Sequence, residues 1–354
     1  MHSIALYIHI PFCVRKCAYC DFISFPNHLD ALPAYLARIC SQMERWKSPR
    51  RRVSSVYIGG GTPSLLSGAQ MAQLMDVVRK CFDLQEGAEV SMEANPGTVD
   101  REKLLAYRAA GIGRLSFGAQ AMQPHLLRTL GRIHVWEDVE MAVQMAREAG
   151  FSNINIDLMY ALPGQTIEDW HQTLMAAIAL APEHISAYSL ILEEGTRLFE
   201  RVECGELHDI DDDEALDMQR LATRLLSEAG LVRYEISNYA KPGCECVHNI
   251  VYWTGGEYLG IGAAAHSLMD GARFSQTSAL EYAQNLSEPL SESDIFMERV
   301  MLGTRMMQGI SRDGIDEQRL ESLRGLVEYN ARRLRLTERG LELHNRVVLS
   351  LLED

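Results

Sequence analysis

The sequence lacks any run of roughly 18 consecutive apolar residues, so it predicts no helix that crosses a membrane. It also lacks the basic-then-apolar N-terminal stretch of a secretory signal. Basic residues are the minority, with 34 lysines and arginines against 48 acids and a net charge of −14. That balance disfavours nonspecific binding to nucleic acid and an electrostatic membrane anchor. We therefore expect a cytoplasmic protein without a nucleic-acid partner.

A disulfide framework is not expected either, because cytoplasmic thiols stay reduced. The eight cysteines then predict ligands or small buried residues, and three of them, Cys13, Cys17 and Cys20, follow an apolar run at CxxxCxxC spacing. Thiolates are soft ligands that suit iron–sulfur clusters or zinc. A [4Fe–4S] cluster normally takes four thiolates. Three in one loop indicate either a ligand from elsewhere in the chain or one iron left open for chemistry.

Zinc is the competing interpretation of this loop. A structural zinc site usually combines two Cys-x-x-Cys arms or adds histidines at helical spacing. The second arm is missing here, and the nearby candidates His9 and Asp21 fall on a predicted strand and at the end of the loop. The spacing therefore favours an iron–sulfur cluster.

Strand and helix signals alternate about six times before the composition changes. Strands are expected at 4–10, 53–58, 89–94, 114–118, 154–160 and 185–192, and helical patterns at 31–46, 69–81 and 139–146. This alternation predicts an α/β protein with βαβ units around a parallel sheet. Six units predict a partial (β/α)6, TIM-like barrel that is open on one side, with a full eight-unit barrel as the alternative.

Residues 9–22 read HIPFCVRKCAYCDF. This stretch resembles the cluster loop of the radical S-adenosylmethionine (SAM) superfamily, in the branch of oxygen-independent coproporphyrinogen III oxidases and the haem chaperones called HemW. The resemblance implies a [4Fe–4S] cluster on Cys13, Cys17 and Cys20, whose open iron chelates the methionine moiety of SAM. An electron from the cluster would cleave SAM to methionine and a 5′-deoxyadenosyl radical. The cofactor carries this chemistry, and the protein binds and orients it.

Polar residues and glycines recur where the predicted strands end, which is where parallel barrels gather their catalytic groups. One such motif, GGGTPS at 59–64, is equally typical of a plain tight turn. Matched to the family, the positions expected to contact SAM are Tyr7, Tyr19, Gly60, Gly61, Thr62, Glu93, Gln120, Arg132 and Asp157. Together they offer carboxylates, a guanidinium and aromatic walls for the ammonium, carboxylate, ribose and adenine of SAM.

An accessory segment at about 204–275 is dense in glycine, aromatic and polar residues and contains HNIVYW. It resembles the HNxxYW motif of the HemW branch, so His248, Tyr252 and Trp253 are candidate haem contacts, with His248 as an axial iron ligand. A core histidine beside buried aromatic residues is an equally good interpretation. Cys244, Cys246 and His248 also permit a second metal site with CxCxH spacing.

The C-terminal part becomes helical and more evenly charged from about residue 291. Residues 332–336 and 347–352 are expected to flank a small hairpin or wing. This pattern resembles the compact, winged-helix-like C-terminal domain of the family. We therefore expect a radical SAM barrel with its accessory segment at 1–285 and a small domain at 286–354.

Two departures separate this chain from the oxidases of the branch. Those enzymes carry a further cysteine two positions after the third, where this chain has Phe22, and an N-terminal extension, where only three residues precede the first predicted strand here. Both departures favour the HemW type. The expected function is therefore a haem-binding chaperone that delivers haem to haem proteins such as respiratory enzymes. The alternative is an oxidase that decarboxylates propionates of coproporphyrinogen III to vinyl groups.

The same resemblance implies the cofactors and partners. The cofactors are a [4Fe–4S] cluster and SAM, and haem is the cargo. The partners are recipient haem proteins and an electron donor such as flavodoxin or ferredoxin. The resemblance also leaves room for a homodimer and for peripheral contact with a membrane. SAM cleavage is expected to be retained, whereas oxidase activity is disfavoured.

Overall fold

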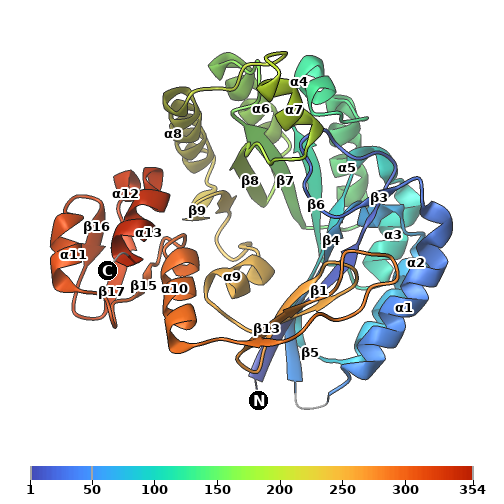
Figure 1. Ribbon diagram of the computed structural model, residues 1–354. Helices are drawn as coiled ribbons and strands as arrows, with labels where there is room; N and C mark the ends of the chain where they lie inside the picture. Colours follow the sequence, from blue (N-terminus) through green and yellow to red (C-terminus); the bar gives the residue numbers. More distant parts are fainter. Residues whose placement is uncertain (1, 49–50, 353–354) are drawn as a thin grey trace.

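Six parallel strands form the centre of the fold (Figure 1). The computed structural model describes residues 2–48 and 51–352. The six strands lie side by side in chain order: β1 (His2–Ile10), β4 (Arg51–Gly60), β5 (Asp83–Ala94), β6 (Arg114–Gln120), β7 (Asn153–Tyr160) and β8 (His184–Ser189). Every neighbouring pair is parallel, which confirms the predicted partial barrel. The last strand ends at Ser189, three residues before the predicted end.

Helices follow these strands, and most of them pack on the outer face of the sheet (Figure 1). They are α1 (Leu32–Arg45), α2 (Gly68–Cys81), α3 (Arg101–Ala109), α4 (Pro124–Thr129), α5 (Trp136–Glu148), α6 (Ile167–Ala179), α7 (Arg197–Glu203) and α8 (Asp212–Glu228). The two short helices at 124–129 and 197–203 belong instead to a separate apolar cluster with Ala18 and Tyr19 of the cysteine loop. Five of the helices α1–α8 begin at capping side chains that accept hydrogen bonds from free backbone N–H groups, namely Ser67, Asp100, Thr166, Thr196 and Asp211. The predicted helices are confirmed. None of the described helices is both long and apolar enough to cross a membrane.

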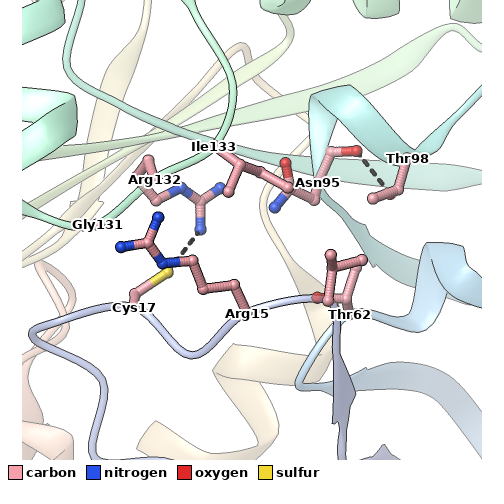
Figure 2. A pocket seen from close by; sticks show the side chains of 9 residues that line it. Arg15, Cys17, Thr62, Asn95, Thr98, Gly131, Arg132 and Ile133 are labelled. Carbon is pink, nitrogen blue, oxygen red and sulfur yellow. Dashed lines mark hydrogen bonds between the residues drawn. The ribbon is translucent and has the colours of Figure 1, made fainter. Parts of the chain in front are cut away.

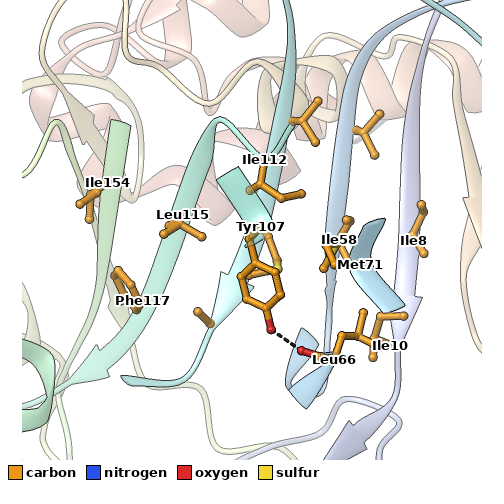
Figure 3. Close-up of a cluster of buried hydrophobic side chains, with 14 of the residues drawn as sticks. Ile8, Ile10, Ile58, Leu66, Met71, Tyr107, Ile112, Leu115, Phe117 and Ile154 are labelled. Carbon is orange, nitrogen blue, oxygen red and sulfur yellow. Dashed lines mark hydrogen bonds between the residues drawn. The ribbon is translucent and has the colours of Figure 1, made fainter. Parts of the chain in front are cut away.

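Each strand of the barrel has two different faces, because successive side chains point to opposite sides. Ile8, Ile58 and Leu115 are fully buried in a continuous apolar core under the helices (Figure 3). Polar and aromatic residues such as Tyr57 and Glu93 alternate with them and face the interior of the barrel. The apolar face anchors the helices, and the other face is free to carry a site.

The accessory segment extends the sheet at both ends. Beyond β8 lies β10 (Asn238–Ala240), which is antiparallel to β8, and then β9 (Val232–Glu235), which is antiparallel to β10. Beyond β1 lie β11 (Tyr258–Ile261), which is parallel to β1, and then β12 (His266–Met269), β13 (Ala272–Ser275) and β14 (Glu288–Pro289). A short helix, α9 (Val247–Trp253), packs against β4. Among the described residues the sheet ends at β14 and β9, so the eight-unit barrel is wrong.

The C-terminal part has its own apolar core. It contains α10 (Glu292–Gly303), β15 (Ile310–Ser311), α11 (Glu317–Ser322), β16 (Val327–Tyr329), β17 (Arg333–Leu336), α12 (Glu338–Glu342) and α13 (His344–Leu352). The strands form a three-stranded antiparallel sheet, as expected for a wing. Of the two stretches expected to flank the hairpin or wing, 332–336 forms β17, but the prediction for 347–352 is wrong, because this stretch lies in α13. Val347, Val348 and Leu351 lie on one buried helix face there. The domain boundary at 285/286 stays a prediction.

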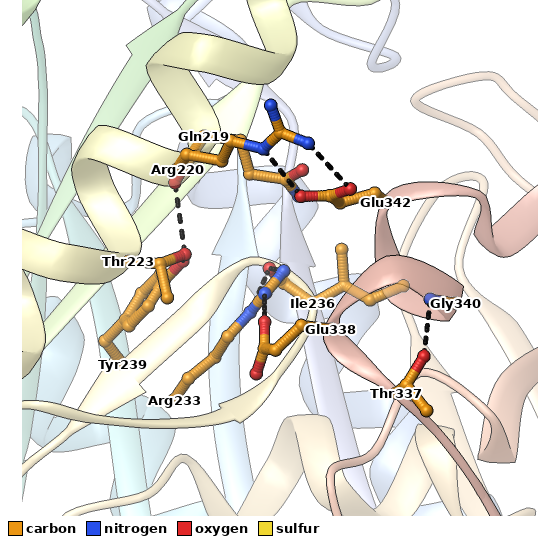
Figure 4. A network of polar contacts seen from close by, with 10 residues as sticks. All are labelled: Gln219, Arg220, Thr223, Arg233, Ile236, Tyr239, Thr337, Glu338, Gly340 and Glu342. Carbon is orange, nitrogen blue, oxygen red and sulfur yellow. Dashed lines mark hydrogen bonds and ion pairs between the residues drawn. The ribbon is translucent and has the colours of Figure 1, made fainter. Parts of the chain in front are cut away.

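Polar contacts join the C-terminal part to the barrel (Figure 4). Arg220 of α8 donates two hydrogen bonds to the Glu342 carboxylate, at 2.7 and 3.0 Å. The second contact is more buried: Arg305 donates to the fully buried carboxylate of Glu235 at 3.1 Å and lies 4.4 Å from the ring of Trp253. The C-terminal part therefore contacts α9 directly.

The fold generates a stability prediction at Tyr107 of α3, which is fully buried (Figure 3). Its hydroxyl donates to the carbonyl oxygens of Ser64 and Leu66, next to the glycine-rich turn. Tyr107→Phe should lower the free energy of unfolding by about 1–3 kcal/mol, because the buried Leu66 carbonyl loses its side-chain donor, whereas the Ser64 carbonyl still accepts from Lys103 Nζ. Urea unfolding followed by circular dichroism measures this change. The exposed Tyr329→Phe is the control, and an equal loss in both variants would contradict the interpretation.

Candidate functional site

The three cysteines of the predicted cluster loop lie just beyond the end of β1. Cys13 is in the short strand β2 (Phe12–Cys13), which pairs with β3 (Phe25–Pro26), and Cys17 and Cys20 follow in the loop. All are unpaired thiols. Two of them accept hydrogen bonds from other loops: the Thr62 hydroxyl lies 3.6 Å from Cys13 Sγ, and Arg132 Nη1 lies 3.5 Å from Cys17 Sγ.

The donor set fits a cluster. Burial raises the pKa of the Cys13 thiol, and that of Cys20 to about 11. The three sulfurs are close enough that their charges interact, and the Arg132 guanidinium opposes the negative charge on Cys13. Within residues 2–48 and 51–352, no three histidine, cysteine, aspartate or glutamate side chains lie close enough together to bind one metal ion. A cubane does not need this closeness, because each thiolate binds a different iron. Its positive charge would also deprotonate the thiols.

The glycine-rich turn is fixed tightly against the end of β1. Gly60 has a φ of +112°, and a Cβ there would lie 2.5 Å from the His9 ring. A Cβ on Gly61 would lie 2.7 Å from the Phe12 carbonyl oxygen and 3.0 Å from Cys13 Sγ. Gly61 N–H donates to the carbonyl of Ile10 at 2.9 Å. Only glycine fits at these two positions. The two glycines are therefore required by the packing of the turn against His9 and Phe12, and not merely by the need for a tight turn.

Glu93 of β5 holds the other side of this turn. Its carboxylate accepts the N–H of Gly60 at 2.9 Å and the hydroxyl of Tyr57 at 3.1 Å. Burial and, second, the negative charge of Asp157 together raise the pKa of Glu93 to about 7. Asp157 itself accepts from the Ser116 hydroxyl at 2.7 Å. Glu93 and Asp157 thus both lie in the barrel interior, and Glu93 titrates near neutrality.

The remaining predicted SAM positions lie around the same opening. Arg132 Nη2 donates to the Gly118 carbonyl at 2.6 Å, and a Cβ on Gly118 would touch both Arg132 and Gln120. Gln120 itself has a φ of +67° at the end of β6. Tyr19 lies within the electrostatic reach of Arg132, which counters the rise in the Tyr19 pKa caused by burial. Tyr7 bonds His9 Nδ1 at 2.9 Å. The structure therefore brings all nine positions together.

A small cavity opens beside the cluster loop (Figure 2). It is lined by Val14, Arg15, Cys17, Thr62, Asn95, Thr98, Gly131, Arg132 and Ile133. The sequence interpretation missed Asn95 and Thr98, which follow β5 and are joined by a 2.8 Å hydrogen bond from the Thr98 hydroxyl to the Asn95 carbonyl. Their place in the sequence could have indicated them, because, like Thr62, they follow the end of a parallel strand.

The barrel interior is polar, and this feature was also missed. His184 Nδ1 lies 2.6 Å from Asn155 Oδ1, and His184 Nε2 lies 2.9 Å from the Tyr234 hydroxyl. Asn155 also donates to Ser116 at 2.6 Å. The signal was present in the sequence, because polar residues alternate with apolar ones along strands β6, β7 and β8.

His248 lies on α9 inside the barrel and is 1% exposed. Its Nδ1 lies 3.0 Å from the Ser55 hydroxyl and its Nε2 lies 2.9 Å from the Tyr252 hydroxyl. The ring stacks on Tyr57 with centroids 5.1 Å apart. Burial lowers the pKa of His248 to about 3, so the imidazole is neutral. Both ring nitrogens are engaged, and ligation of haem iron by His248 stays a prediction.

The CxCxH alternative gains no support from the geometry. The thiol of Cys246 is buried and donates to Glu89 at 3.6 Å. The same carboxylate accepts the backbone N–H groups of Val247 and His248 at 3.1 and 3.3 Å, so it holds the first turn of α9. In the part of the chain that the structure describes, no metal-binding group of three forms here.

Comparison with known proteins agrees with this geometry. Residues 7–177 match the radical SAM superfamily. The haem chaperone HemW of Mycobacterium tuberculosis strain H37Rv is 38% identical, covering 98% of this chain and 94% of the relative. HemW of Bacillus subtilis is 34% identical, covering 96% and 92%. The chain belongs to the HemW family. Membership confirms the resemblance of the cluster loop, and the radical SAM superfamily implies a [4Fe–4S] cluster and SAM.

A solved structure supports the fold of this HemW family member. Coproporphyrinogen III oxidase (HemN) from Escherichia coli, described as a radical SAM enzyme, superposes with a TM-score of 0.84. The match covers 99% of this chain and 90% of that chain at 23% sequence identity. At that identity, the likeness shows a shared fold and does not choose between chaperone and oxidase.

Removal of one cluster cysteine should abolish the cluster. We expect Cys17→Ala, after anaerobic reconstitution, to lose the charge-transfer absorption, with iron and sulfide content falling to background, because two thiolates do not hold a cubane. Absorption spectra and iron assays measure this. Cys204→Ala, at an exposed thiol outside the loop, is the matched control and should keep the cluster. A full iron content in Cys17→Ala would remove Cys17 from the ligand set.

Glu93 generates a prediction on pH. The folded protein holds this proton more tightly than the unfolded chain, so the contribution to stability is present below pH 4.5 and is lost as the pH rises through about 7. Glu93→Gln stays neutral and should gain on the order of 2 kcal/mol relative to the native protein between these pH values. Urea unfolding across the range measures this gain. The exposed Glu194→Gln should show no such trend, and a flat difference for Glu93→Gln would contradict the shift.

Proposed function

We propose that the protein is a haem chaperone that binds haem and passes it to haem proteins such as respiratory enzymes. The observation that carries the proposal is the 38% identity, over 98% of this chain, to a protein named as a haem chaperone. The match includes the accessory segment and the C-terminal part, so it is not limited to the cluster loop. Phe22, in place of a further cysteine, agrees with it.

The opening of the barrel would hold the cluster and SAM. Cys13, Cys17 and Cys20 would bind three irons, and the carboxylate of Glu93 is available to accept the SAM ammonium. Arg132 offers a guanidinium to the carboxylate of SAM. When bound, the cluster supplies the electron that cleaves SAM. Of the protein groups, Gly60 and Gly61 let the turn lie close against His9 and the cysteine loop, and the rings of Tyr7 and Tyr57 stack in the interior.

Haem would be held at α9. His248 is neutral, which is the form that binds iron. For His248 to act as a ligand, either Ser55 or Tyr252 must release one of its nitrogens. Trp253, at the end of the same helix, lies under the guanidinium of Arg305 from the C-terminal part. A movement of α9 would therefore change the contact between Trp253 and Arg305 of the C-terminal part.

The remaining partners complete the proposal. A one-electron donor such as flavodoxin or ferredoxin would reduce the cluster, and the free thiols suit the reducing cytoplasm. A homodimer and a peripheral membrane contact, at which a respiratory recipient would take up haem, remain parts of the same proposal.

The chaperone proposal predicts stoichiometric haem binding without multiple turnover. Haemin titrated into anaerobically reconstituted protein should give a Soret band that saturates at one haem per chain. His248→Ala should change the band and weaken binding by about tenfold or more, as loss of a metal-site contact does. His344→Ala, which removes a half-buried histidine of the C-terminal part, is the matched control and should leave the band unchanged.

The oxidase alternative is tested with the same protein. Coproporphyrinogen III, SAM and a reductant should yield no protoporphyrinogen beyond background. Formation of protoporphyrinogen over many turnovers would overturn the chaperone proposal. A Soret band that is unaltered in His248→Ala would remove only the assignment of His248.

A further inference from the structure

A second, larger cavity lies on the outer side of the sheet, between α1 and residues 276–284. Its volume is about 580 Å³, within the range of small-molecule pockets. It is lined by Arg38, Gln42, Arg45, Trp46, Gln276, Tyr282, Ala283 and Gln284. The α1 residues among these are spaced i, i+4, i+7 and i+8, so they lie on one face of the helix. None of these residues belongs to the cluster, SAM or haem positions.

Two aromatic rings shape the cavity. Trp46 stacks on Phe274 with centroids 5.4 Å apart and planes within 6°. Tyr282 lies under the guanidinium of Arg38, which is 5.6 Å from the ring centroid. Arg38 also donates to the Tyr282 backbone carbonyl at 3.1 Å, which fixes the loop on the helix. The Arg51 guanidinium lies 5.8 Å from the Trp46 ring centroid, so both rings already have a cation–π contact, and an aromatic ligand would pack against the part of each ring that these contacts leave open.

Two buried polar groups at the cavity have no hydrogen-bond partner among the described residues. They are the Tyr282 hydroxyl and Gln276 Nε2, and each side chain belongs to a residue that is only 4% exposed. Buried donors are nearly always satisfied, and leaving one unpaired destabilises a fold by about 1–3 kcal/mol. A ligand with acceptor atoms would satisfy both.

The cavity is positive in an acidic protein. Its lining contains two arginines and no aspartate or glutamate, although the chain carries a net charge of −14. Neither Arg38 nor Arg45 forms an ion pair within the residues that the structure covers. Both guanidiniums oppose the rise in the Tyr282 pKa that burial causes, so both act on the same hydroxyl.

We propose that this cavity binds a planar aromatic ligand that carries carboxylate or phosphate groups. The rings of Trp46 and Tyr282 contact the plane of the ligand, and Arg38 and Arg45 bind its anionic groups. Gln276 and the Tyr282 hydroxyl donate to its acceptor atoms. Two sources share this chemistry: a tetrapyrrole, through its carboxylates, and a flavin nucleotide, through its phosphate.

Packed rings connect this cavity to the cluster loop. Tyr35 lies 5.8 Å from Tyr282 and 5.3 Å from Phe12, which precedes Cys13 in the chain. The Tyr35 hydroxyl donates to the His9 carbonyl at 3.0 Å and accepts the N–H of Ala263 at 2.8 Å. A ligand in the cavity therefore lies behind the cluster loop, on the side of the sheet opposite His248.

The test uses three probes with the reconstituted protein: coproporphyrin III, haemin and flavin mononucleotide. At least one should quench the fluorescence of Trp46 with one site per chain, and Trp46→Phe should remove that quenching. Arg38→Gln combined with Arg45→Gln should weaken binding at least tenfold, because charge-assisted hydrogen bonds are lost. Arg38→Lys combined with Arg45→Lys keeps the charge and should retain part of the affinity. The tetrapyrrole and flavin arms distinguish the two ligand sources.

The control is Arg224→Gln, which makes one of these two Arg→Gln changes at an exposed position of α8 far from α1 (Figure 1). It should bind like the native protein. Failure of all three probes to quench Trp46, or equal affinity in the double glutamine variant and the native protein, would overturn the proposal. Coproporphyrin III contains no iron, so its binding does not depend on His248. This inference and the chaperone proposal can therefore fail separately.

Discussion

Each parallel strand of this barrel must satisfy two environments at once, and the rest of the structure depends on that constraint. Ile8, Ile58 and Leu115 are fully buried under the helices and hold the barrel together. The positions between them are polar or aromatic and face inward. A conventional barrel fills its interior with branched apolar side chains. Here the interior carries hydrogen-bonded networks around Glu93 and Asn155, which need the apolar face to keep them in register.

Electrostatics divides the molecule into regions of different character. The opening of the barrel combines thiols, the carboxylates of Glu93 and Asp157 and the guanidinium of Arg132, so it suits a ligand with charges of both signs. Burial, and then the positive charge of Arg114, lower the pKa of His248 and keep its imidazole neutral, while the Glu89 carboxylate accepts its backbone N–H. The cavity at α1 is positive. One acidic chain therefore contains three regions of different charge and polarity at separate places.

Much of this could be predicted from the sequence, because the signals were local. The spacing of Cys13, Cys17 and Cys20 lies within one loop, and the helix and strand periods of the six units repeat along the chain. The pairing of strands that are far apart in the sequence has no such local pattern, so the sequence did not predict it. Nothing around Tyr258–Ile261 indicates that this strand pairs with β1, or that α9 lies inside the barrel. The apolar stretch at 347–352 has too few residues for its hydrophobic period to distinguish a helix from a strand. Its packing in the C-terminal core determines that it is helical.

The pairing of β11 with β1 has a consequence for the order of assembly. Residues 5–8 are held between β4 and β11, and the register joins Ile8 to Ile261. The strand that supports the cysteine loop, β1, is made before its second neighbour, because β11 follows it much later in the chain. Until then, one edge of that strand stays open to water. Maturation of the metal centre should therefore wait for the synthesis of β11, so iron delivery would act on a chain that already extends past residue 261.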